Sequence, residues 1–540
     1  MEINKKLYSK GISRVYKKEK LFFDLDEIEY YKKTFNELIN KKFIIADSFD
    51  SEQWTIPDFM NNNFRNIRFN LDVFQEIQTG LKIYTTLLIY KGRSSSSIKA
   101  TISSLKTIIL ASNGFKNVEA ISSLFNSLKS PYFFSSNLRK FIDFYPLINH
   151  DDILKLCTKI HENQRINRKL PPFYEIFIFD EIINDYFNTK EGSLNLLYKP
   201  IQLWWQITTI LPMRPNDFLR IKTNCIKKES NGTYWITIPR SKIKKDSIDD
   251  EYPTQTFQIT KHIYELILDV KNQVQQLVGV TEYLIPQTLL SSGKLLFPNT
   301  NRKVIENRLV LEQFHSILNR FTTEIVQGLY SELNLSKFLP IHTRHIAIIN
   351  LFLQGFNLIS IAHMSGHSEI NSPSNYYSHA ENFVDSYIYS LVNMGLSDNI
   401  SKNMSGSFIG WRRDAFDRGK LYEDVELENK YSRVDFGYCG DNENFPFNCT
   451  DCRSCNFYIF KPSLNEYEEG INWLESYSHK LSEQIYETIR SMITINSTTK
   501  IAIDSVIDSE LKSHSRELQK FMDLRVSVEI KLQEEINNND

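Results

Sequence analysis

Two β-rich runs stand within a stretch of sequence that is otherwise helical in pattern. They are TYWITIPR (233–240) and YPTQTFQIT (252–260), and the polar, lysine-rich segment 241–251 separates them. Two such runs joined by a polar segment predict a β-hairpin with a long turn. Helical text precedes the hairpin from residue 174 and continues after it to residue 395. The predicted fold class is therefore mainly α with a small antiparallel β-sheet (α+β).

The part of the chain before residue 174 contains two predicted breaks. Residues 1–68 are mixed and aromatic-rich, and the pattern of WTIPDF (54–59) indicates a break. Apolar residues then recur at helical spacing in LKIYTTLLIY (81–90) and IKATISSLKTIIL (98–110). The serines between these two runs suit helix N-caps. Pro-Pro in HENQRINRKLPPF (161–173) cannot continue a helix, so this segment is predicted to be a linker.

A chain of 540 residues and 63.5 kDa is too long for one compact core, and about three or four domains are expected. The predicted divisions are an N-terminal arm region (1–68), a helical domain (69–170), a domain with the β-hairpin (171–398), a cysteine-bearing segment (425–460) and a C-terminal helical hairpin or coiled-coil extension (461–540).

Two helices are predicted in the last part of the chain, 464–540. Apolar residues fall near a/d spacing in the first helix, and the second has a similar stripe. Such stripes suit an antiparallel hairpin or an oligomerisation element, and they suit packing onto the chain's own core equally well. The stripes consist of Ile471, Leu474, Leu481, Ile485 and Met492, and of Ile507, Leu511, Leu518 and Met522.

Charge is distributed unevenly along the chain. The formal net charge is −1, from 64 Lys and Arg against 65 Asp and Glu. Residues 464–540 hold 15 acidic and 8 basic groups, a net charge of −7, which leaves the first 463 residues at +6. This asymmetry permits DNA binding but does not require it, because charge runs are usually solvated faces.

The composition, with 41% apolar, 24% charged and 13% aromatic residues, is that of an ordinary globular protein. No apolar run is long enough to span a bilayer, so no membrane partner is expected. The basic N-terminus, residues 1–20, lacks the apolar core of a secretory signal. A cytoplasmic location with reduced thiols is therefore expected.

Four of the six cysteines lie within 17 residues, in the pattern C-x9-C-x2-C-x2-C. In a reduced protein this spacing predicts one tetrahedral structural Zn²⁺ site, with unligated thiols as the alternative. The remaining two, Cys157 and Cys225, stand alone and are predicted to be buried or idle. The predicted zinc ligands are Cys439, Cys449, Cys452 and Cys455.

Four segments hold residues that could carry chemistry. LPMRPNDFLRI (211–221) contains Arg214, and Asp217 lies where a helix would let its carboxylate orient the guanidinium. The other three segments are the turn with Lys242, Lys244 and Lys245, the helix start with His342, Arg344 and His345, and GHSEINSPSNYYSH (366–379). Each of the four segments alone has an ordinary explanation, such as a surface ion pair, a solvated lysine, a capping histidine or a core tyrosine.

Taken together and in this order, these segments resemble the tyrosine recombinases, the integrase family that cuts and rejoins DNA. The family's motif is Arg-His, an apolar helix, Gly eleven residues after the Arg, Gly-His ending 23 after it, and then Tyr-x-His. By motif the resemblance covers about residues 174–395, and by helical pattern it extends to 71–161. In this chain the motif is met by Arg344-His345, Gly355, Gly366-His367 and Tyr377-Ser378-His379.

The resemblance implies roles for individual residues in a recombinase or transposase that integrates or excises a mobile element. Arg214 and Arg344 would bind the non-bridging oxygens of the phosphorane, which two planar guanidiniums suit. Tyr377 would form a covalent 3′-phosphotyrosine that stores the bond energy, so the chemistry would need neither metal nor ATP. Lys242 would protonate the departing 5′ oxygen, and His367 would hydrogen-bond the phosphate.

Two positions depart from the family's pattern. The first histidine of the motif normally lies three residues before the second Arg, where this chain has Ile341. His342 is one residue closer, and a local bulge would let it serve as the catalytic histidine. The usual count from the Gly-His pair reaches Tyr376, whereas the Tyr-x-His ending selects Tyr377. One extra residue in the loop around Pro373 reconciles the two, so Tyr377 is the predicted nucleophile.

The resemblance also implies an architecture and partners. Residues 69–170 would be the helical core-binding domain and 171–398 the catalytic domain, and together they would clamp duplex DNA as a homo-tetramer on two sites. Some transposase-type members carry a Cys-rich C-terminal extension of this kind. Three alternatives stay open: Lys244 in place of Lys242, an inactive DNA-binding accessory protein acting with related recombinases, and a zinc-dependent regulator without cleavage.

Overall fold

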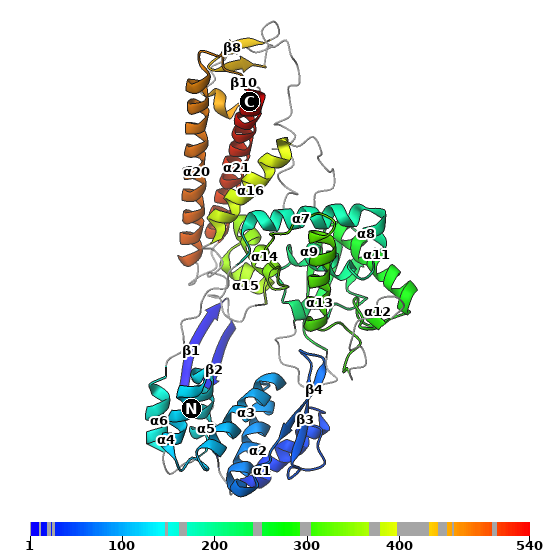
Figure 1. The fold of residues 1–540 in the computed structure, drawn as a ribbon, viewed down its shortest axis with the longest axis vertical. Helices are drawn as coiled ribbons and strands as arrows, with labels where there is room; N and C mark the ends of the chain where they lie inside the picture. The colour runs from blue at the N-terminus through cyan, green and yellow to red at the C-terminus, as the bar shows by residue number, and fades with distance from the viewer. Residues whose placement is uncertain are drawn as a thin grey trace. The chain divides into compact units, whose positions relative to one another are not determined.

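The computed structural model describes residues 2–9, 12–18, 23, 27–145, 150–160, 170–240, 251–291, 304–366, 379–396, 431–440, 451–455, 458–498 and 505–539 (Figure 1). Two compact units share the chain. The first comprises Met1–Arg168, Leu219–Gln258 and Val274–Leu311, and the second comprises Lys169–Phe218, Ile259–Gln273 and Glu312–Asp540. Helices dominate both units, which confirms the mainly α class. The described residues contain four small sheets of two or three strands, where the sequence predicted one.

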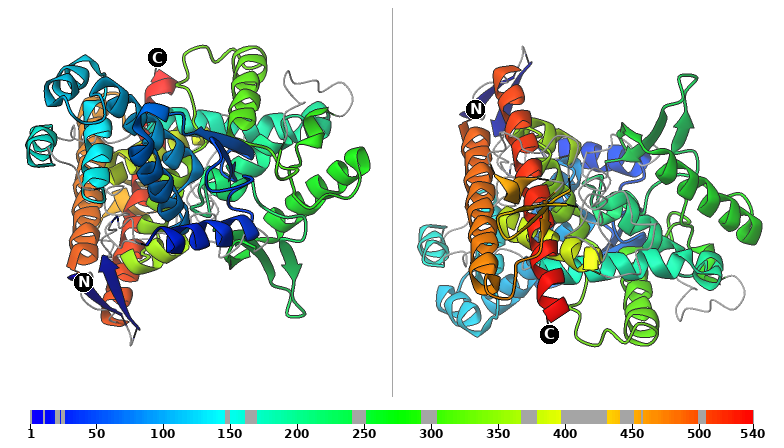
Figure 2. Two further views of the ribbon diagram at one scale, coloured as in Figure 1. Left: turned by 90° about the horizontal axis from the view of Figure 1, so that it is seen from below. Right: turned by 90° about the horizontal axis from the view of Figure 1, so that it is seen from above.

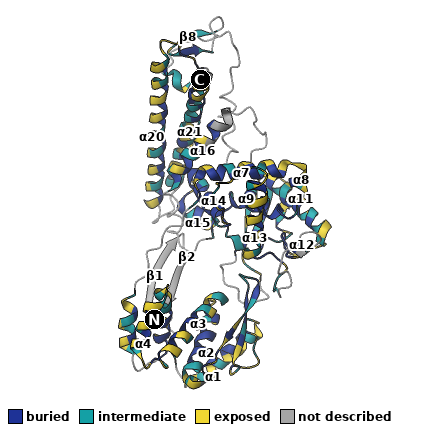
Figure 3. Cartoon of the chain, viewed as in Figure 1, coloured by how far each residue is buried: buried dark blue, intermediate teal, exposed yellow. Residues whose placement is uncertain are grey.

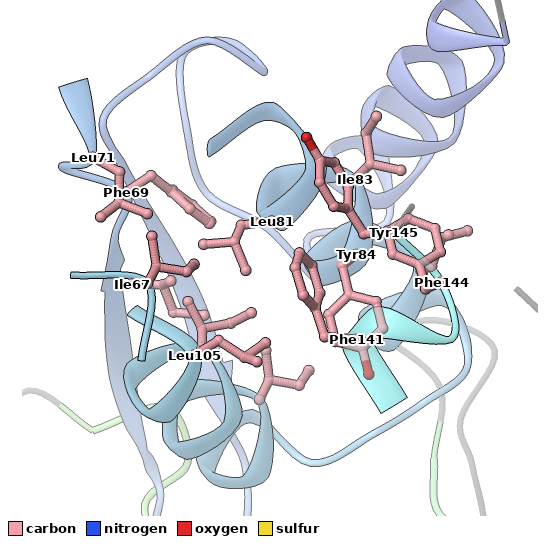
Figure 4. Packing of buried hydrophobic residues seen from close by; sticks show 14 of the residues in the cluster. Ile67, Phe69, Leu71, Leu81, Ile83, Tyr84, Leu105, Phe141, Phe144 and Tyr145 are labelled. Atoms are coloured by element: carbon pink, nitrogen blue, oxygen red, sulfur yellow. The ribbon is translucent and has the colours of Figure 1, made fainter. Parts of the chain in front are cut away.

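The N-terminal part of the first unit is a helical domain with a continuous apolar core (Figure 4). Phe69, Leu81, Leu105 and Phe141 are fully buried in this core, and they come from different elements along the chain. Its helices are α1 (Ile28–Asn40), α2 (Gln75–Tyr90), α3 (Ser95–Ala111), α4 (Val118–Ser127), α5 (Pro131–Ile142) and α6 (His150–Thr158), and η1 (Asp72–Phe74) precedes α2. An antiparallel pair, β1 (Glu2–Ser9) and β2 (Ile12–Lys18), also belongs to this unit.

Local chemistry explains where α2 and α3 are separated. Ser94 has extended backbone angles and its side chain accepts a hydrogen bond from the Ser97 amide, so it caps the N-terminus of α3. This confirms the predicted serine caps. Asn117 caps α4 in the same way, by accepting from the Ala120 amide at 3.0 Å.

The predicted break at WTIPDF is wrong. These residues form β3 (Gln53–Asp58), which pairs in antiparallel register with β4 (Asn63–Arg68). Trp54 is fully buried, and its register partner Ile67 and the nearby Ile56 are also in the helical domain's core. Pro57 is tolerated because a two-stranded sheet has only edge strands, where a missing N–H need not break a ladder.

The first unit also contains the predicted hairpin, now with a third strand. The sheet order is β5 (Ile226–Lys228), β6 (Tyr234–Pro239) and β7 (Thr254–Ile259). At the base of the turn the Arg240 amide donates to the Pro253 carbonyl at 2.8 Å, which confirms the hairpin. The Arg240 side chain is buried and donates to Gln255 at 2.6 Å.

A buried ionic network ties the β3–β4 turn to later parts of the same unit. Arg220 and Arg308 both donate to the Phe59 carbonyl. Glu306 accepts from Arg308 Nε at 2.6 Å and from the Tyr283 hydroxyl at 3.0 Å. Burial alone would raise the pKa of the Glu306 carboxyl, but Arg308 and Arg220 outweigh it and hold the pKa below its ordinary value.

The second unit holds helices from both sides of the β-hairpin sequence. Its helix α14 (His342–Leu353) is buried on almost every side, including its polar first turn. The others are α7 (Phe173–Asn188), α8 (Lys190–Leu194), α9 (Lys199–Thr208), α10 (Pro215–Phe218), α13 (Leu311–Phe321), the π-helical η2 (Thr322–Gln327), α15 (Leu358–Met364) and α16 (Ala380–Leu396). The helix α11 (Lys261–Val278) begins in this unit, and α12 (Thr288–Ser291) belongs to the first.

The C-terminal part of the second unit joins the cysteine segment to two long helices. The helices α20 (Tyr467–Thr498) and α21 (Ser505–Asn539) lie side by side in Figures 1 and 2, and we call them the C-terminal hairpin. Their buried sides face inward and their exposed sides face outward (Figure 3). Two residues of the predicted stripes, Ile471 and Ile507, are half-buried. The other seven are buried, which confirms most of the prediction: Leu474, Leu481, Ile485, Met492, Leu511, Leu518 and Met522.

A three-stranded sheet packs on one end of this hairpin. The strand order is β10 (Tyr458–Phe460), β9 (Gly437–Cys439) and β8 (Ser432–Val434). Tyr458 and Phe460 share an apolar cluster with Leu474 of α20 and Val528 of α21. Over the described residues, none of the helices is both long and apolar enough to cross a membrane.

Candidate active site

Arg214 lies between α9 and α10, in a stretch that two prolines keep out of regular helix. Its Nη2 donates to the Gly366 carbonyl at 2.9 Å, and its Nη1 lies 3.8 Å from the Asp217 carboxylate. Asp217 is fully buried, whereas the Arg214 side chain keeps 16% of its surface exposed. The expected orienting contact between this carboxylate and this guanidinium is therefore present, with the guanidinium as the more accessible partner.

Arg344 is anchored from the first turn of α14. Its Nη2 donates to the Ser365 carbonyl at 2.7 Å and its Nη1 donates to the Pro212 carbonyl at 3.1 Å. Pro212 is only two residues from Arg214, and Ser365 is adjacent to Gly366. The two arginines are thus brought together by neighbouring carbonyl groups at the end of α15, immediately before His367.

The first turn of α14 places its histidines at the same end of the helix. His342 is the first residue of α14, and its Nδ1 accepts a hydrogen bond from the Leu339 amide at 3.2 Å. In the neutral ring this bond keeps the proton on Nε2, which is then a donor. His342 and His345 are both buried, at 5% and 9% exposure. An anion at this helix start would also meet the positive end of the helix dipole.

Neutral hydrogen bonds fix α9 to the start of α14. The Thr208 hydroxyl donates to the Thr343 hydroxyl at 2.6 Å, and the Trp204 indole donates to the Pro340 carbonyl at 3.1 Å. All these groups are buried. These contacts could not be predicted from the sequence, because they join positions more than 130 residues apart by ordinary side chains.

Two glycines of the motif have backbone angles that favour glycine. Gly355 ends α14 with φ +79, and Gly366 follows α15 with φ +61. Both angles lie in the left-handed region, which L side chains rarely adopt. Their fixed spacing from Arg344 is therefore explained by two helix ends rather than by direct chemistry.

The remaining predicted residues lie outside the described part of the chain. These are Lys242 with its alternative Lys244, His367, and Tyr377 with its alternative Tyr376. Of their flanks, His379 is described, and its ring lies 6.4 Å from that of Phe173. The structure thus brings Arg214, His342 and Arg344 into one unit and leaves the placement of the nucleophile and the lysine as predictions.

The cysteine segment contains three described cysteines. Cys452 begins the short helix η4 (Cys452–Ser454), and the Cys455 amide donates to the Cys452 carbonyl at 3.0 Å. Cys439 ends β9 and pairs with Tyr458, three residues after Cys455. Cys449 lies outside the described residues. Among those described, no three His, Cys, Asp or Glu side chains are grouped closely enough to hold a metal ion.

A half-buried lysine lies beside this segment. Lys531 of α21 donates to the Cys455 carbonyl at 3.3 Å and lies over the Tyr458 ring at 5.2 Å. Burial lowers the pKa of Lys531 to about 8, while the thiols of Cys455 and Cys452 act in the opposite direction. The two remaining cysteines, Cys157 and Cys225, are buried as predicted.

No protein-family model matches the chain, and a comparison with curated proteins finds no match. Among solved structures, the XerH site-specific recombinase in a post-cleavage complex with a palindromic difH substrate has 17% identity and a TM-score of 0.36, over 57% of this chain and 84% of that one. The Tn1549 transposon integrase (residues 82–397) with circular intermediate DNA has 14% identity and a TM-score of 0.34, over 56% and 95%. The XerA recombinase has 11% identity and a TM-score of 0.25, over 55% and 92%. Likenesses of this size do not establish a shared family.

Proposed function

We propose that this chain is a tyrosine recombinase of the integrase or transposase type, which cleaves and rejoins duplex DNA through a covalent 3′-phosphotyrosine. The observation that carries the proposal is the convergence of Arg214 and Arg344 on adjacent carbonyls. These carbonyls, of Ser365 and Gly366, directly precede His367 of the sequence motif. Two residues 130 positions apart, chosen from sequence as one phosphate clamp, thus lie at one place.

The side chains of Arg214 and Arg344 suit the binding of a phosphodiester that is under nucleophilic attack. The phosphorane carries extra negative charge on its non-bridging oxygens, and two guanidiniums provide permanent positive charge with planar donor geometry. The His342 ring, with its Nδ1 accepting from Leu339, offers Nε2–H as a further donor. Because these groups are held by buried backbone contacts, they need little reorganisation when the charge develops.

The chemical step balances without a cofactor. Tyr377 gives its hydroxyl proton to solvent as its oxygen attacks phosphorus, and the bond from phosphorus to the 5′ oxygen breaks. Lys242 donates the proton that the departing 5′ oxygen takes up. Rejoining is the reverse reaction with a 5′ hydroxyl of another strand as nucleophile, so the phosphotyrosine keeps the energy of the original bond.

DNA is the proposed partner, and integration or excision of a mobile element is the proposed outcome. The first 463 residues carry +6, whereas the last part is acidic. Phosphate contacts would dominate binding by residues 71–395, so affinity should fall steeply with salt. Assembly as a homo-tetramer on two recombination sites belongs to the same proposal.

The test is a nicked suicide substrate made from a candidate element end. Wild-type protein should form a covalent protein–DNA adduct that resists denaturation. Tyr377→Phe should abolish the adduct and Tyr376→Phe should retain it, since the two variants differ only in which adjacent hydroxyl is removed. The reverse pattern would assign the reaction to Tyr376.

A second candidate is a DNA-binding accessory protein that has lost activity. The observation in its favour is His342, which stands one residue closer to Arg344 than the family's pattern has it. Salt-dependent DNA binding without an adduct from any element end would support this candidate over the first.

We also propose that Cys439, Cys449, Cys452 and Cys455 hold one structural Zn²⁺. The chain's backbone supports the proposal, since η4 and the β9–β10 pair bring the three described cysteines to one end of the C-terminal hairpin. Bound zinc would fix the fold of this segment, and the net negative charge of a Zn²⁺ ion with four thiolates would suit the neighbouring Lys531. Metal analysis should give about one zinc per chain. Cys452→Ser should lower that content and Cys225→Ser should not, and zinc-free wild-type protein would contradict the proposal.

A further inference from the structure

The C-terminal hairpin contacts the junction between α14 and α15 at very short range. A Cβ added to Gly355 would lie 2.7 Å from the Leu511 carbonyl oxygen of α21. The buried Ser515 hydroxyl, one turn further along α21, donates to the Leu353 carbonyl at 2.8 Å. Gly355 therefore serves two purposes: it adopts the angle that ends α14, and it lets α21 pass over that end.

Both helices of the hairpin also contribute to the start of α15. Asn357 caps α15 by accepting from the Ser360 amide at 2.7 Å, and its Nδ2 donates to Asp508 of α21 at 2.5 Å. The Leu358 amide donates to the side chain of Asn496 of α20 at 2.9 Å. A first-turn amide that would otherwise lack an intrahelical partner is thus bonded by the hairpin.

On the other side of the candidate site, the hairpin contacts α16. Asp385 accepts from the Tyr486 hydroxyl of α20 at 2.5 Å and from Arg525 of α21 at 2.8 Å. Glu381 accepts from Arg490 of α20 at 3.0 Å. The Arg490 side chain is 66% exposed, whereas that of Arg525 is 20% exposed, so the bonds to Asp385 are the better shielded.

The contacts on α15 and α16 enclose one stretch of the sequence. The helix α15 leads to Gly366, whose carbonyl anchors Arg214, and α16 begins at Ala380. Between them, along the chain, lie His367 and Tyr377. The same two helices, α20 and α21, therefore hold the elements on both sides of the segment that carries the proposed nucleophile.

We propose that the C-terminal hairpin is a positioning element for strand cleavage, and that Asp385 is the positioning residue at which both of its helices hold α16. This inference rests on the proposed function. The hairpin would hold α16 and the α14–α15 junction, which flank the Tyr377 segment in the sequence, in a fixed arrangement, because both are bonded to the same two helices. Small displacements of a nucleophile slow a reaction strongly even where binding is unchanged.

Charge argues against DNA as the partner of the hairpin. Residues 464–540 have a net charge of −7, so DNA phosphates would repel them. Its polar contacts through Ser515, Asn496 and Asp385 are instead made with this same chain. The sequence left open whether the stripes pack on the chain's own core, and the stripe residues Leu481, Leu511 and Leu518 are buried within this chain.

The experiment uses the full-length protein with a nicked suicide substrate. The rate of adduct formation is measured at saturating DNA, and the dissociation constant is measured separately by gel shift. Asp385→Ala should slow adduct formation about 10- to 100-fold with the dissociation constant unchanged. Tyr486→Phe removes one hydroxyl and keeps the ring, so it should show a smaller loss in the same direction. Arg490→Gln, which removes the exposed pair, is the matched control and should behave as wild type.

Two further measurements separate positioning from general destabilisation. Arg525→Gln should slow adduct formation and Arg525→Lys should recover much of the rate, because the bond to Asp385 needs a cation. Hydrogen exchange of the full-length Asp385→Ala protein should rise in α16 and stay unchanged in α2 and α3.

The outcomes distinguish the inference from the function on which it rests. A wild-type rate for Asp385→Ala, with Tyr377→Phe inactive, would overturn the positioning role and leave the recombinase proposal standing. A wild-type protein that forms no adduct would remove the recombinase proposal and the inference with it. A rise in hydrogen exchange throughout the second unit would show that Asp385 serves stability alone.

Discussion

Two arginine pairs in this protein converge on backbone carbonyls, and they differ in the charge that accompanies them. Arg220 and Arg308 both donate to the Phe59 carbonyl, and Glu306 bonds Arg308 at 2.6 Å and lies 3.9 Å from Arg220. In the candidate site, Arg214 and Arg344 donate to adjacent neutral carbonyls, and the Asp217 carboxylate lies 3.8 Å from Arg214.

The two pairs differ in the distance to the nearest carboxylate given above and in the exposure of their guanidinium groups. In the first pair a carboxylate sits within hydrogen-bonding distance, so the charge is largely balanced inside the protein and the network joins chain segments. In the candidate site the Asp217 carboxylate lies 3.8 Å from Arg214 Nη1, and the Arg214 side chain remains 16% exposed. A partly exposed guanidinium such as that of Arg214 can reach a phosphate oxygen, whereas the Arg308 guanidinium is fully buried. Arginine pairing alone would not have distinguished the two places.

The largest expected effect on the free energy of unfolding comes from the pair Arg220 and Arg308. Arg308→Met should lower the free energy of unfolding by about 3–5 kcal/mol, since it leaves Glu306, whose side chain is only 16% exposed, without its closest partner. Denaturant unfolding of the full-length protein measures this loss. A loss below about 1 kcal/mol would mean that the network is a minor contributor, as exposed ion pairs are.

The largest expected effect on the rate of adduct formation comes from the pair Arg214 and Arg344. Arg344→Lys should slow adduct formation about 100- to 1000-fold, because a single ammonium cannot reproduce the planar guanidinium beside the phosphate. Its unfolding free energy should fall by less than that of Arg308→Met. Single-turnover kinetics and denaturant unfolding on the same preparations measure both. If Arg344→Lys cost stability alone, the two arginine pairs would have the same role.

Lowering the pH should reduce the stability that Glu306 provides through its contacts with Arg308 and Arg220. The pKa of Glu306 is lowered in the folded protein: burial would raise it, but Arg308 and Arg220 outweigh burial. A carboxylate with a depressed pKa stabilises the fold above its ordinary value of 4.5, and that contribution is lost as the pH falls through the folded pKa. The melting temperature of the wild type should exceed that of Glu306→Gln at pH 7, and the difference should shrink below pH 4.5. A difference that stayed constant with pH would show that Glu306 does not titrate as described.

The smallest effect is expected at the displaced histidine. His342→Gln should slow adduct formation about 10-fold, because one hydrogen bond to a charged group is lost while both arginines remain. The loss should be smaller than that of Arg344→Lys in the same assay. An unchanged rate would show that His342 has no part in the reaction and would favour another donor.

Local patterns in the sequence were sufficient for several elements. The serine cap at Ser94, the hairpin strands on either side of segment 241–250, and the apolar stripes of α20 and α21 are each set by residues close together in the chain. The same holds for the turn-forming glycines of the motif. Local chemistry of this kind is visible without a structure.

Contacts between distant residues could not be predicted in this way. The pattern of WTIPDF predicts a break, whereas Trp54 and Ile56 lie in a strand whose side chains are buried in the core of the helical domain. Asp385 and Arg525 are 140 residues apart, and neither position is distinctive on its own. Arg220 lies six residues after Arg214, and nothing local separates a structural arginine from a phosphate-binding one.

The central claim is that Tyr377 forms a phosphotyrosine beside the two site arginines. The most direct measurement is mass spectrometry of the protease-digested adduct that wild-type protein forms with a nicked element end. The account predicts a nucleotide joined through a 3′-phosphate to the Tyr377 hydroxyl, absent when Arg344→Lys protein is used for the same short reaction time. An adduct at Tyr376 or at another residue, or none with any element end, would contradict it.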